Sequence, residues 1–279
     1  MNENSLSIPH GASAITEVFE RRKAQGGKSL VAYIMAGDPD LGTTEKIIRA
    51  LSGIDVDIIE LGVPFSDPLA DGPVIQEAAQ RSLRQGVNLH KIFDMVRDVR
   101  LTVDTPILLM TYYNLFWRYG LETFTQDAAG VGIDGVIVPD LPAEEAAPFR
   151  QALEAEGLAF VPLVAPTSTD ERIHTITHEA RGFIYYISRT GVTGEQKSIS
   201  ADLAENVGKI RQNSSLPIAV GFGISTPEQA KTVSEHADGV VMGSAIVRLI
   251  HDTPHLHERV VAKFLRPFVD SLHGNAESQ

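Results

Sequence analysis

The segment Ser29–Leu51 reads SLVAYIMAGDPDLGTTEKIIRAL and combines a strand pattern, a turn and a helical pattern. Ser29–Met35 is a short apolar run of the kind found in buried parallel strands. Thr44–Leu51 (TEKIIRAL) has its apolar residues at helical spacing. The turn between them lacks the G-x-G-x-x-G pattern that usually follows the first strand of an open dinucleotide-binding sheet. The segment therefore predicts one β/α unit and disfavours that open sheet.

Seven further units of this kind follow along the chain. The predicted strands are Ser29–Met35, Val56–Leu61, Pro106–Thr111, Gly135–Val138, Ala159–Leu163, Phe183–Ile187, Pro217–Val220 and Gly239–Met242. Helical patterns include Glu144–Glu156, Glu171–His178 and Leu203–Arg211, and Ala12–Arg22 predicts an extra helix before the first strand. The sequences S-x-x-E at Ser168–Glu171 and Ser225–Glu228 predict capping boxes. Eight units without a composition break predict an α/β fold, a single (β/α)8 TIM barrel with an extra N-terminal helix. Strand number alone leaves a doubly wound open sheet as the alternative.

Composition bounds the class of protein. The chain has 279 residues, a net charge of −12 and no Cys. We expect one domain over residues 1–279, with a core at about 12–269 and polar tails. The lack of Cys excludes disulfides, thiolate nucleophiles and zinc–thiolate sites, and the acidic balance disfavours nucleic-acid binding. MNENSLSIPHG at the N-terminus has no signal-peptide pattern, so we expect a cytoplasmic protein.

Glu60 stands near the end of the second predicted strand. Because side chains alternate along a strand, we expect Val56, Ile58 and Glu60 to share one face that ends in a carboxylate at the barrel mouth. Burial there would raise the pKa of this carboxyl and make it a candidate general acid or base. A solvated glutamate, or one paired with an arginine, is the alternative interpretation.

The loop after Glu60 carries Asp67 and Asp71 among three prolines, whose fixed φ angles predict a stiff segment. The stretch is also typical of a simple turn before a helix. Glu60, Asp67 and Asp71 could instead provide oxygen ligands for Mg²⁺. Histidines also cluster in HDTPHLH, at residues 251–257, but a proline interrupts the spacing that would place them on one helical face. Neither group predicts a metal site strongly.

The last two predicted strands end in glycine-rich turns. Gly221–Ser225 (GFGIS) follows the seventh strand, and Gly243-Ser244 opens a helix after the eighth. Glycines such as Gly223 and Gly243 let backbone N–H groups approach an anion, and a helix N-terminus adds a partial positive charge. These loops usually hold phosphate in this fold. We therefore expect a phosphate site here, with tight turns alone as the alternative.

The sixth predicted strand leads into SRTGVTGE at Ser188–Glu195. Its Gly, Thr and Ser content is typical of a mobile lid that excludes water from a ligand. Tyr185 has the same parity as Phe183 and Ile187, so we expect its ring to face the barrel interior. A purely structural core tyrosine is the alternative.

The sequence resembles the tryptophan synthase alpha subunit family from about residue 12 to about residue 269. The longest shared motif is ELGVPFSDPLADGP, at Glu60–Pro73. The shorter ones are AGDPD (Ala36–Asp40), LMTYYN (Leu109–Asn114), VPDLPAEE (Val138–Glu145), SRTGVTGE (Ser188–Glu195), GFGIS (Gly221–Ser225) and MGSAIV (Met242–Val247).

This resemblance implies a single barrel that cleaves indole-3-glycerol phosphate to indole and glyceraldehyde 3-phosphate in tryptophan biosynthesis. It implies no metal or organic cofactor on this chain. It also implies an α2β2 complex with a beta subunit that carries pyridoxal phosphate and joins the indole to serine.

The resemblance further implies roles for single residues. Glu60 resembles the catalytic acid/base, and Asp71 the group that accepts a hydrogen bond from the indole N–H. Tyr185 resembles a tyrosine beside the substrate, and Thr193 the lid threonine that meets Asp71 on closure. Asp67 and its neighbouring prolines resemble the loop that communicates with the beta subunit. The implied phosphate contacts are Gly194, Gly223, Gly243 and Ser244.

Two residues depart from the family pattern, because Tyr33 and Met35 stand where the family usually has Phe and Thr. Their effect on the indole pocket is open. Rival interpretations are a non-catalytic barrel that binds and activates a beta subunit, another phosphate-binding barrel lyase or isomerase, and a stand-alone indole-releasing lyase. The presence of Glu60 and Asp71 argues against a pure scaffold.

Overall fold

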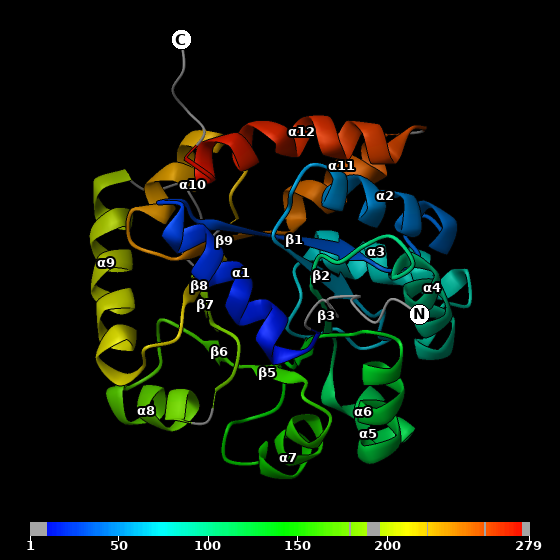
Figure 1. Cartoon of the computed structure of the whole chain (residues 1–279), viewed down its shortest axis with the longest axis horizontal. Helices are drawn as coiled ribbons and strands as arrows, with labels where there is room; N and C mark the ends of the chain where they lie inside the picture. Colours follow the sequence, from blue (N-terminus) through cyan, green and yellow to red (C-terminus); the bar gives the residue numbers. More distant parts are fainter. Residues whose placement is uncertain (1–9, 179, 189–195, 222, 254, 275–279) are drawn as a thin grey trace, which may run out of the picture.

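The computed structural model describes residues 10–274 except 179, 189–195, 222 and 254. Helices and parallel strands alternate along it (Figure 1). The strands are β1 (Ser29–Met35), β2 (Ile58–Gly62), β3 (Ile107–Met110), β4 (Gly135–Ile137), β5 (Ala159–Val161), β6 (Leu163–Val164), β7 (Ile184–Ile187), β8 (Ile218–Gly221) and β9 (Gly239–Met242). The helices are α1 (Ala12–Ala24), α2 (Leu41–Gly53), α3 (Pro73–Arg84), α4 (Leu89–Val99), α5 (Tyr113–Tyr119), α6 (Leu121–Gly130), α7 (Ala147–Ala155), α8 (Asp170–His178), α9 (Gln196–Asn213), α10 (Pro227–Ser234), α11 (Ser244–Asp252) and α12 (His257–Leu272).

The strands form one parallel sheet in the order β5-β4-β3-β2-β1-β9-β8-β7-β6. Its two edge strands belong to one run of chain, because only Pro162 separates β5 from β6. The predicted strand Ala159–Leu163 is therefore split: its first part pairs with β4 and its second part with β7. Proline has no N–H for a ladder, but its carbonyl accepts a 3.0 Å hydrogen bond from the Tyr185 N–H. The sheet thus closes into an eight-fold TIM barrel, and the open-sheet alternative is wrong.

The predicted N-terminal helix is confirmed as α1, and it covers the end of the barrel opposite the strand C-termini (Figure 1). Ile15 and Phe19 of α1 belong to the same apolar cluster as the inward side chains Val31, Ile58 and Leu108. The Phe19 ring lies 5.4 Å from that of Phe183. Burial of this apolar surface fills the barrel interior and leaves the opposite end for polar groups.

Three of the sequence predictions were wrong in detail. Val56 does not share the face of Ile58 and Glu60, because β2 begins only at Ile58 and Val56 packs in the outer apolar cluster with the helices. The cap of α10 is Thr226, whose side chain and that of Gln229 form the capping box one residue later than predicted. At α8 the hydroxyl of Thr169, and not of Ser168, accepts from the Arg172 N–H.

Three aspartates fix neighbouring strands at the α1 end of the barrel. Each directly precedes a strand, and each bonds to one residue at or next to the start of the strand before it in the chain. The aspartate carboxylate accepts a hydrogen bond from the N–H of that residue, and the aspartate N–H donates to its carbonyl. The pairs are Asp57 with Leu30, Asp134 with Ile107 and Asp238 with Ile218. This reciprocal pair sets the register of β1 with β2, β3 with β4 and β8 with β9. Within the described residues, no helix has the length and apolar character needed to cross a membrane.

Candidate active site

Glu60 lies near the C-terminal end of β2, where the register places it between Tyr33 of β1 and Leu108 of β3. Its side chain is buried, with only 1% of the residue exposed. Neither carboxyl oxygen has a hydrogen-bond partner among the described residues. Burial, and secondarily the negative charge of Asp71, raise the pKa of Glu60 to about 8. A carboxyl with that pKa can both give and take a proton near neutral pH.

Asp71 is positioned by the loop between β2 and α3. Its N–H donates to the Pro68 carbonyl at 3.1 Å, and its own carbonyl accepts from the Gln76 amide at 2.9 Å. Burial raises the pKa of Asp71, while a hydrogen bond from the Tyr112 hydroxyl opposes that rise. The same hydroxyl accepts from the Ala70 N–H at 2.9 Å. Tyr112 therefore holds this loop so that the carboxyl of Asp71 faces that of Glu60.

Sequence reasoning missed Tyr112 as a site residue. The available signal was its position just after the third strand, inside the LMTYYN motif. Its ring stacks on Phe65 of the loop, with centroids 5.1 Å apart, so the tyrosine anchors the loop by packing as well as by hydrogen bonds. Burial and the nearby Asp71 carboxyl raise the pKa of Tyr112 to about 12, so its hydroxyl keeps its proton and remains a donor.

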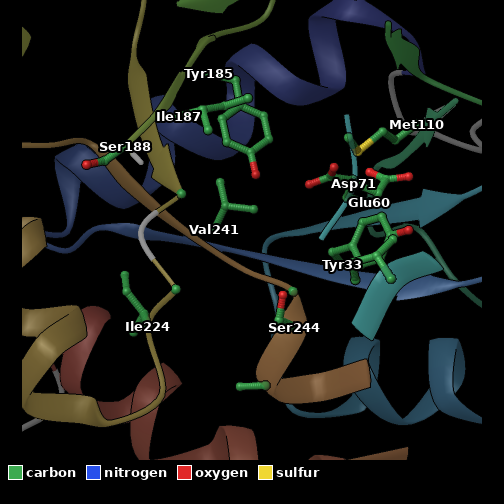
Figure 2. A pocket seen from close by; sticks show the side chains of 15 residues that line it. Tyr33, Glu60, Asp71, Met110, Tyr185, Ile187, Ser188, Ile224, Val241 and Ser244 are labelled. Carbon is green, nitrogen blue, oxygen red and sulfur yellow. The ribbon is translucent and has the colours of Figure 1, made fainter. Parts of the chain in front are cut away.

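Two tyrosines form the walls on either side of Glu60 (Figure 2). Tyr185 faces the interior as predicted, and Tyr33 of β1 also lines the cavity. Each ring lies over a glycine of the next strand. A Cβ at residue 221 would lie 2.8 Å from the Tyr185 hydroxyl, and a Cβ at residue 62 would collide with the Tyr33 hydroxyl, so only glycine fits at either position while the rings stay in place. Burial raises the pKa of both phenols well above the usual value, so both stay protonated.

The glycine-rich turns form the other end of the cavity. Gly223 has φ +60°, a conformation that glycine adopts without strain, and Gly243 is the N-cap of α11. The first N–H groups of α11, at Ser244 and Ala245, have no acceptor within the helix. Among the described residues that line the cavity, none is Lys or Arg. An anion bound here would therefore be held by backbone dipoles.

The structure places most predicted site residues around one cavity of about 240 Å³ (Figure 2). The predicted residues that line it are Glu60, Asp71, Tyr185, Gly223, Gly243 and Ser244. Thr193 and Gly194 lie outside the described residues. Asp67 is exposed and is not among the lining residues, and its carboxylate accepts from the Ser66 hydroxyl. In the described part of the chain, no three His, Asp or Glu side chains are grouped as a metal site requires.

These features define a TIM barrel with a buried carboxyl of raised pKa at its mouth and glycine-rich turns after its last two strands that could hold an anion. A family model described as tryptophan synthase alpha chain matches residues 19–273. The chain therefore belongs to the tryptophan synthase alpha chain family.

Individual relatives agree with this assignment. The tryptophan synthase alpha chain of Geobacter sulfurreducens is 51% identical over 85% of this chain and 90% of its own length. The alpha chain of Pelobacter propionicus is 46% identical over 94% of this chain and 98% of its own length. A crystal structure of the alpha chain from Legionella pneumophila superposes with a TM-score of 0.86 at 34% identity, covering 95% of this chain and 99% of the other. The matching chain of a tryptophan synthase complex from Pyrococcus furiosus superposes with a TM-score of 0.79 at 37% identity, and the match covers 89% of this chain and 99% of the other.

Proposed function

We propose that this chain is the alpha subunit of a tryptophan synthase and cleaves indole-3-glycerol phosphate to indole and glyceraldehyde 3-phosphate. The observation that carries the proposal is the pair of carboxyls in the cavity: Glu60 is buried with free oxygens, and Asp71 lies close enough to raise its pKa. Family membership independently supports a lyase of this type in tryptophan biosynthesis.

The two carboxyls have different tasks in the proposed reaction. Direct cleavage would expel a poor carbanion from C3 of indole, so C3 must first gain a proton. Protonated Glu60 gives that proton, while Asp71 accepts a hydrogen bond from the indole N–H and stabilises the positive charge that develops on the ring. The resulting Glu60 carboxylate then takes the proton of the hydroxyl on the carbon attached to C3 as the C–C bond breaks. This returns Glu60 to its protonated form and releases indole and the aldehyde.

The remaining groups hold the substrate for this step. Gly223, Gly243 and Ser244 bind the phosphate through the turns and the N-terminus of α11. Tyr185 packs beside the indole. Thr193 and Gly194 belong to a lid that closes over the substrate and excludes water, and Gly194 adds a phosphate contact. The proposed chemistry uses protons only, so the chain needs no metal or organic cofactor of its own.

The partner is a beta subunit, as the family name and the Pyrococcus furiosus complex support. We propose an α2β2 assembly in which pyridoxal phosphate is bound by the beta subunit. The loop around Asp67 is the proposed contact, since Leu69 in that loop is 92% exposed. Such an apolar side chain is typical of a protein interface. The expected cytoplasmic location and the single-domain organisation stay predictions.

Indole release from indole-3-glycerol phosphate tests the activity, with the purified chain alone and with a cognate beta subunit. We expect indole in both cases, and more with the partner. Glu60→Gln should lower kcat by at least about 10³-fold while KM changes little, because the amide keeps the shape but cannot cycle a proton. Glu20→Gln is the matched control, since Glu20 is an exposed glutamate of α1 at the opposite end of the barrel.

Three outcomes would contradict the proposal. No indole under either condition would exclude the lyase and favour a barrel that only activates its partner. Full turnover by Glu60→Gln would exclude the acid/base role. Free indole release unaffected by any beta subunit would favour a stand-alone lyase.

A further inference from the structure

A second, much smaller cavity of about 10 Å³, the side cavity, lies next to the main one. Tyr33, Asp71 and Met110 line both cavities, so these three side chains form the wall between them. The volume of the side cavity is about that of one water molecule, so a ligand group enters it only if the wall moves or is shortened.

Apart from the Asp71 carboxyl and the Tyr33 hydroxyl in the shared wall, the lining of the side cavity is apolar or already hydrogen-bonded. Met35, Val63, Ala79 and Pro139 contribute to its lining. The hydroxyl of Thr111 is already bonded to the Val63 carbonyl at 3.1 Å. The Tyr112 hydroxyl is likewise occupied by Ala70 and Asp71. A group that fits this space must therefore be small and apolar.

The three wall residues differ in how far they can move. Tyr33 is confined, because its ring packs on Gly62 and its Cβ lies beside Gly243, at 3.4 Å from where a Cβ of residue 243 would be. Asp71 is held by Tyr112 and by the backbone of its loop. Met110 is only partly buried and packs between two apolar clusters. Figure 2 shows its thioether directed at the two carboxyls. An unbranched thioether with several rotatable bonds is the adaptable part of this wall.

We propose that Met110 is a specificity-determining residue that closes the side cavity to substituents on the aromatic ring of the substrate. The inference rests on the proposed function, because it takes the ligand to be indole-3-glycerol phosphate with Asp71 at its ring N–H. On the benzene ring of indole, C7 is bonded to the fusion carbon that carries the N–H, so a substituent at C7 is directed at the wall around Asp71. C4 is bonded to the other fusion carbon, next to C3, and a substituent there is directed away from this wall. The side cavity therefore accepts a methyl group or a halogen at C7 once Met110 is shortened.

The test compares indole-3-glycerol phosphate with its 7-methyl and 4-methyl derivatives in the complex with the beta subunit. The measured quantity is the ratio of kcat/KM for the methylated derivative to kcat/KM for the unsubstituted substrate. Met110→Ala should raise this ratio for the 7-methyl derivative by at least about tenfold, the selectivity that one methyl group supplies in an apolar pocket. The same ratio for the 4-methyl derivative should not change. Met110→Leu keeps the side-chain volume and should keep the selectivity of the wild type.

Two further variants separate the side cavity from a general loosening of the site. Ile187→Ala enlarges the main cavity away from the shared wall and should give no gain for the 7-methyl derivative. Ala79→Val narrows the side cavity from α3, so adding it to Met110→Ala should cancel the gain. Equal gains at both ring positions, or a gain that survives Ala79→Val, would overturn the proposal.

The proposed function and this inference fail in different ways. If the wild-type complex releases no indole from the unsubstituted substrate, the proposed function fails. If it does so normally but Met110→Ala leaves the selectivity unchanged, only the inference fails. Calorimetric binding of 7-chloroindole and 4-chloroindole gives a readout that does not need turnover. The same change in preference toward the 7-isomer is expected there, and an unchanged preference would count against the side cavity.

Discussion

At the scale of single residues, the burial of Glu60 has a cost in stability. Its pKa is 4.5 in an ordinary peptide and about 8 in the fold. Below pH 4.5 the carboxyl is protonated in both the folded and the unfolded chain, so burial carries no ionisation penalty. Between these values the unfolded chain releases the proton first, and the free energy of unfolding falls as pH rises. A difference of one between the folded and unfolded pKa values corresponds to about 1.4 kcal/mol, so the full loss is about 3–5 kcal/mol above pH 8.

Glu60→Gln should remove this dependence, because glutamine does not ionise. The free energy of unfolding of the variant minus that of the wild type should therefore increase from about pH 5 to about pH 8 by about 3–5 kcal/mol. Denaturant titrations at several pH values measure it. Asp67→Asn serves as the control for the loss of one exposed carboxylate. A difference for Glu60→Gln that does not change with pH would show that Glu60 is not desolvated in the folded protein.

The sequence was informative for residues whose position follows from strand alternation. Glu60 and Tyr185 face inward as their parity predicts. Val56 was misplaced because the alternation starts only where the strand starts, and Asp55 with its positive φ precedes that point. Tyr112 was missed because its hydrogen bond to Asp71 joins loops of two different units, a contact that no local pattern encodes.

At the scale of elements, the start of α1 and the caps of α8 and α10 were predictable to within one residue, whereas α2 and α9 begin earlier, and α7 later, than their periodicity predicted. Near α10 two adjacent residues, Ser225 and Thr226, both suit an N-cap, and the sequence does not decide between them. In the structure the Thr226 hydroxyl accepts from the Gln229 N–H at 3.3 Å, and the Gln229 side chain bonds back to the Thr226 N–H. The strand containing Pro162 was divided for a similar reason, since the closure of the barrel decides which neighbour each part pairs with.

This cap makes a matched pair of substitutions informative. Thr226→Ala should lower the free energy of unfolding by about 1 kcal/mol, because it removes an acceptor for the first turn of α10. Ser225→Ala should cost only a few tenths of a kcal/mol, since the Ser225 hydroxyl is exposed and its one bond, to the Gln229 side chain, caps no backbone group of the helix. Chemical denaturation of both variants measures the two values. A larger loss for Ser225→Ala would place the cap where the sequence pattern first suggested.

At the scale of the whole molecule, the end of the barrel opposite the cavity is held by polar contacts between distant segments. Asp57 accepts hydrogen bonds from Arg22 of α1 and from the Leu30 N–H at the start of β1. The ring of His273, just after α12, lies 2.7 Å from the same carboxylate. One buried side chain thus connects the first helix, the first two strands and the end of the last helix. The sequence shows the aspartate but not its partners, which are up to 216 residues away.

The three strand-fixing aspartates differ in burial, and this sets a graded prediction. The Asp57 side chain is fully buried, whereas that of Asp238 is 26% exposed beside Arg211. Asp57→Ala should lower the free energy of unfolding by about 3–5 kcal/mol, because buried Arg22 loses its buried partner and keeps only the exposed carboxylate of Asp55, while the Leu30 N–H also loses its acceptor. Asp238→Ala should cost about 1 kcal/mol, since water can reach the groups it leaves behind. Denaturant unfolding of both variants measures the difference. Equal losses would mean that the shared backbone contact, rather than the buried charge, holds this end of the barrel.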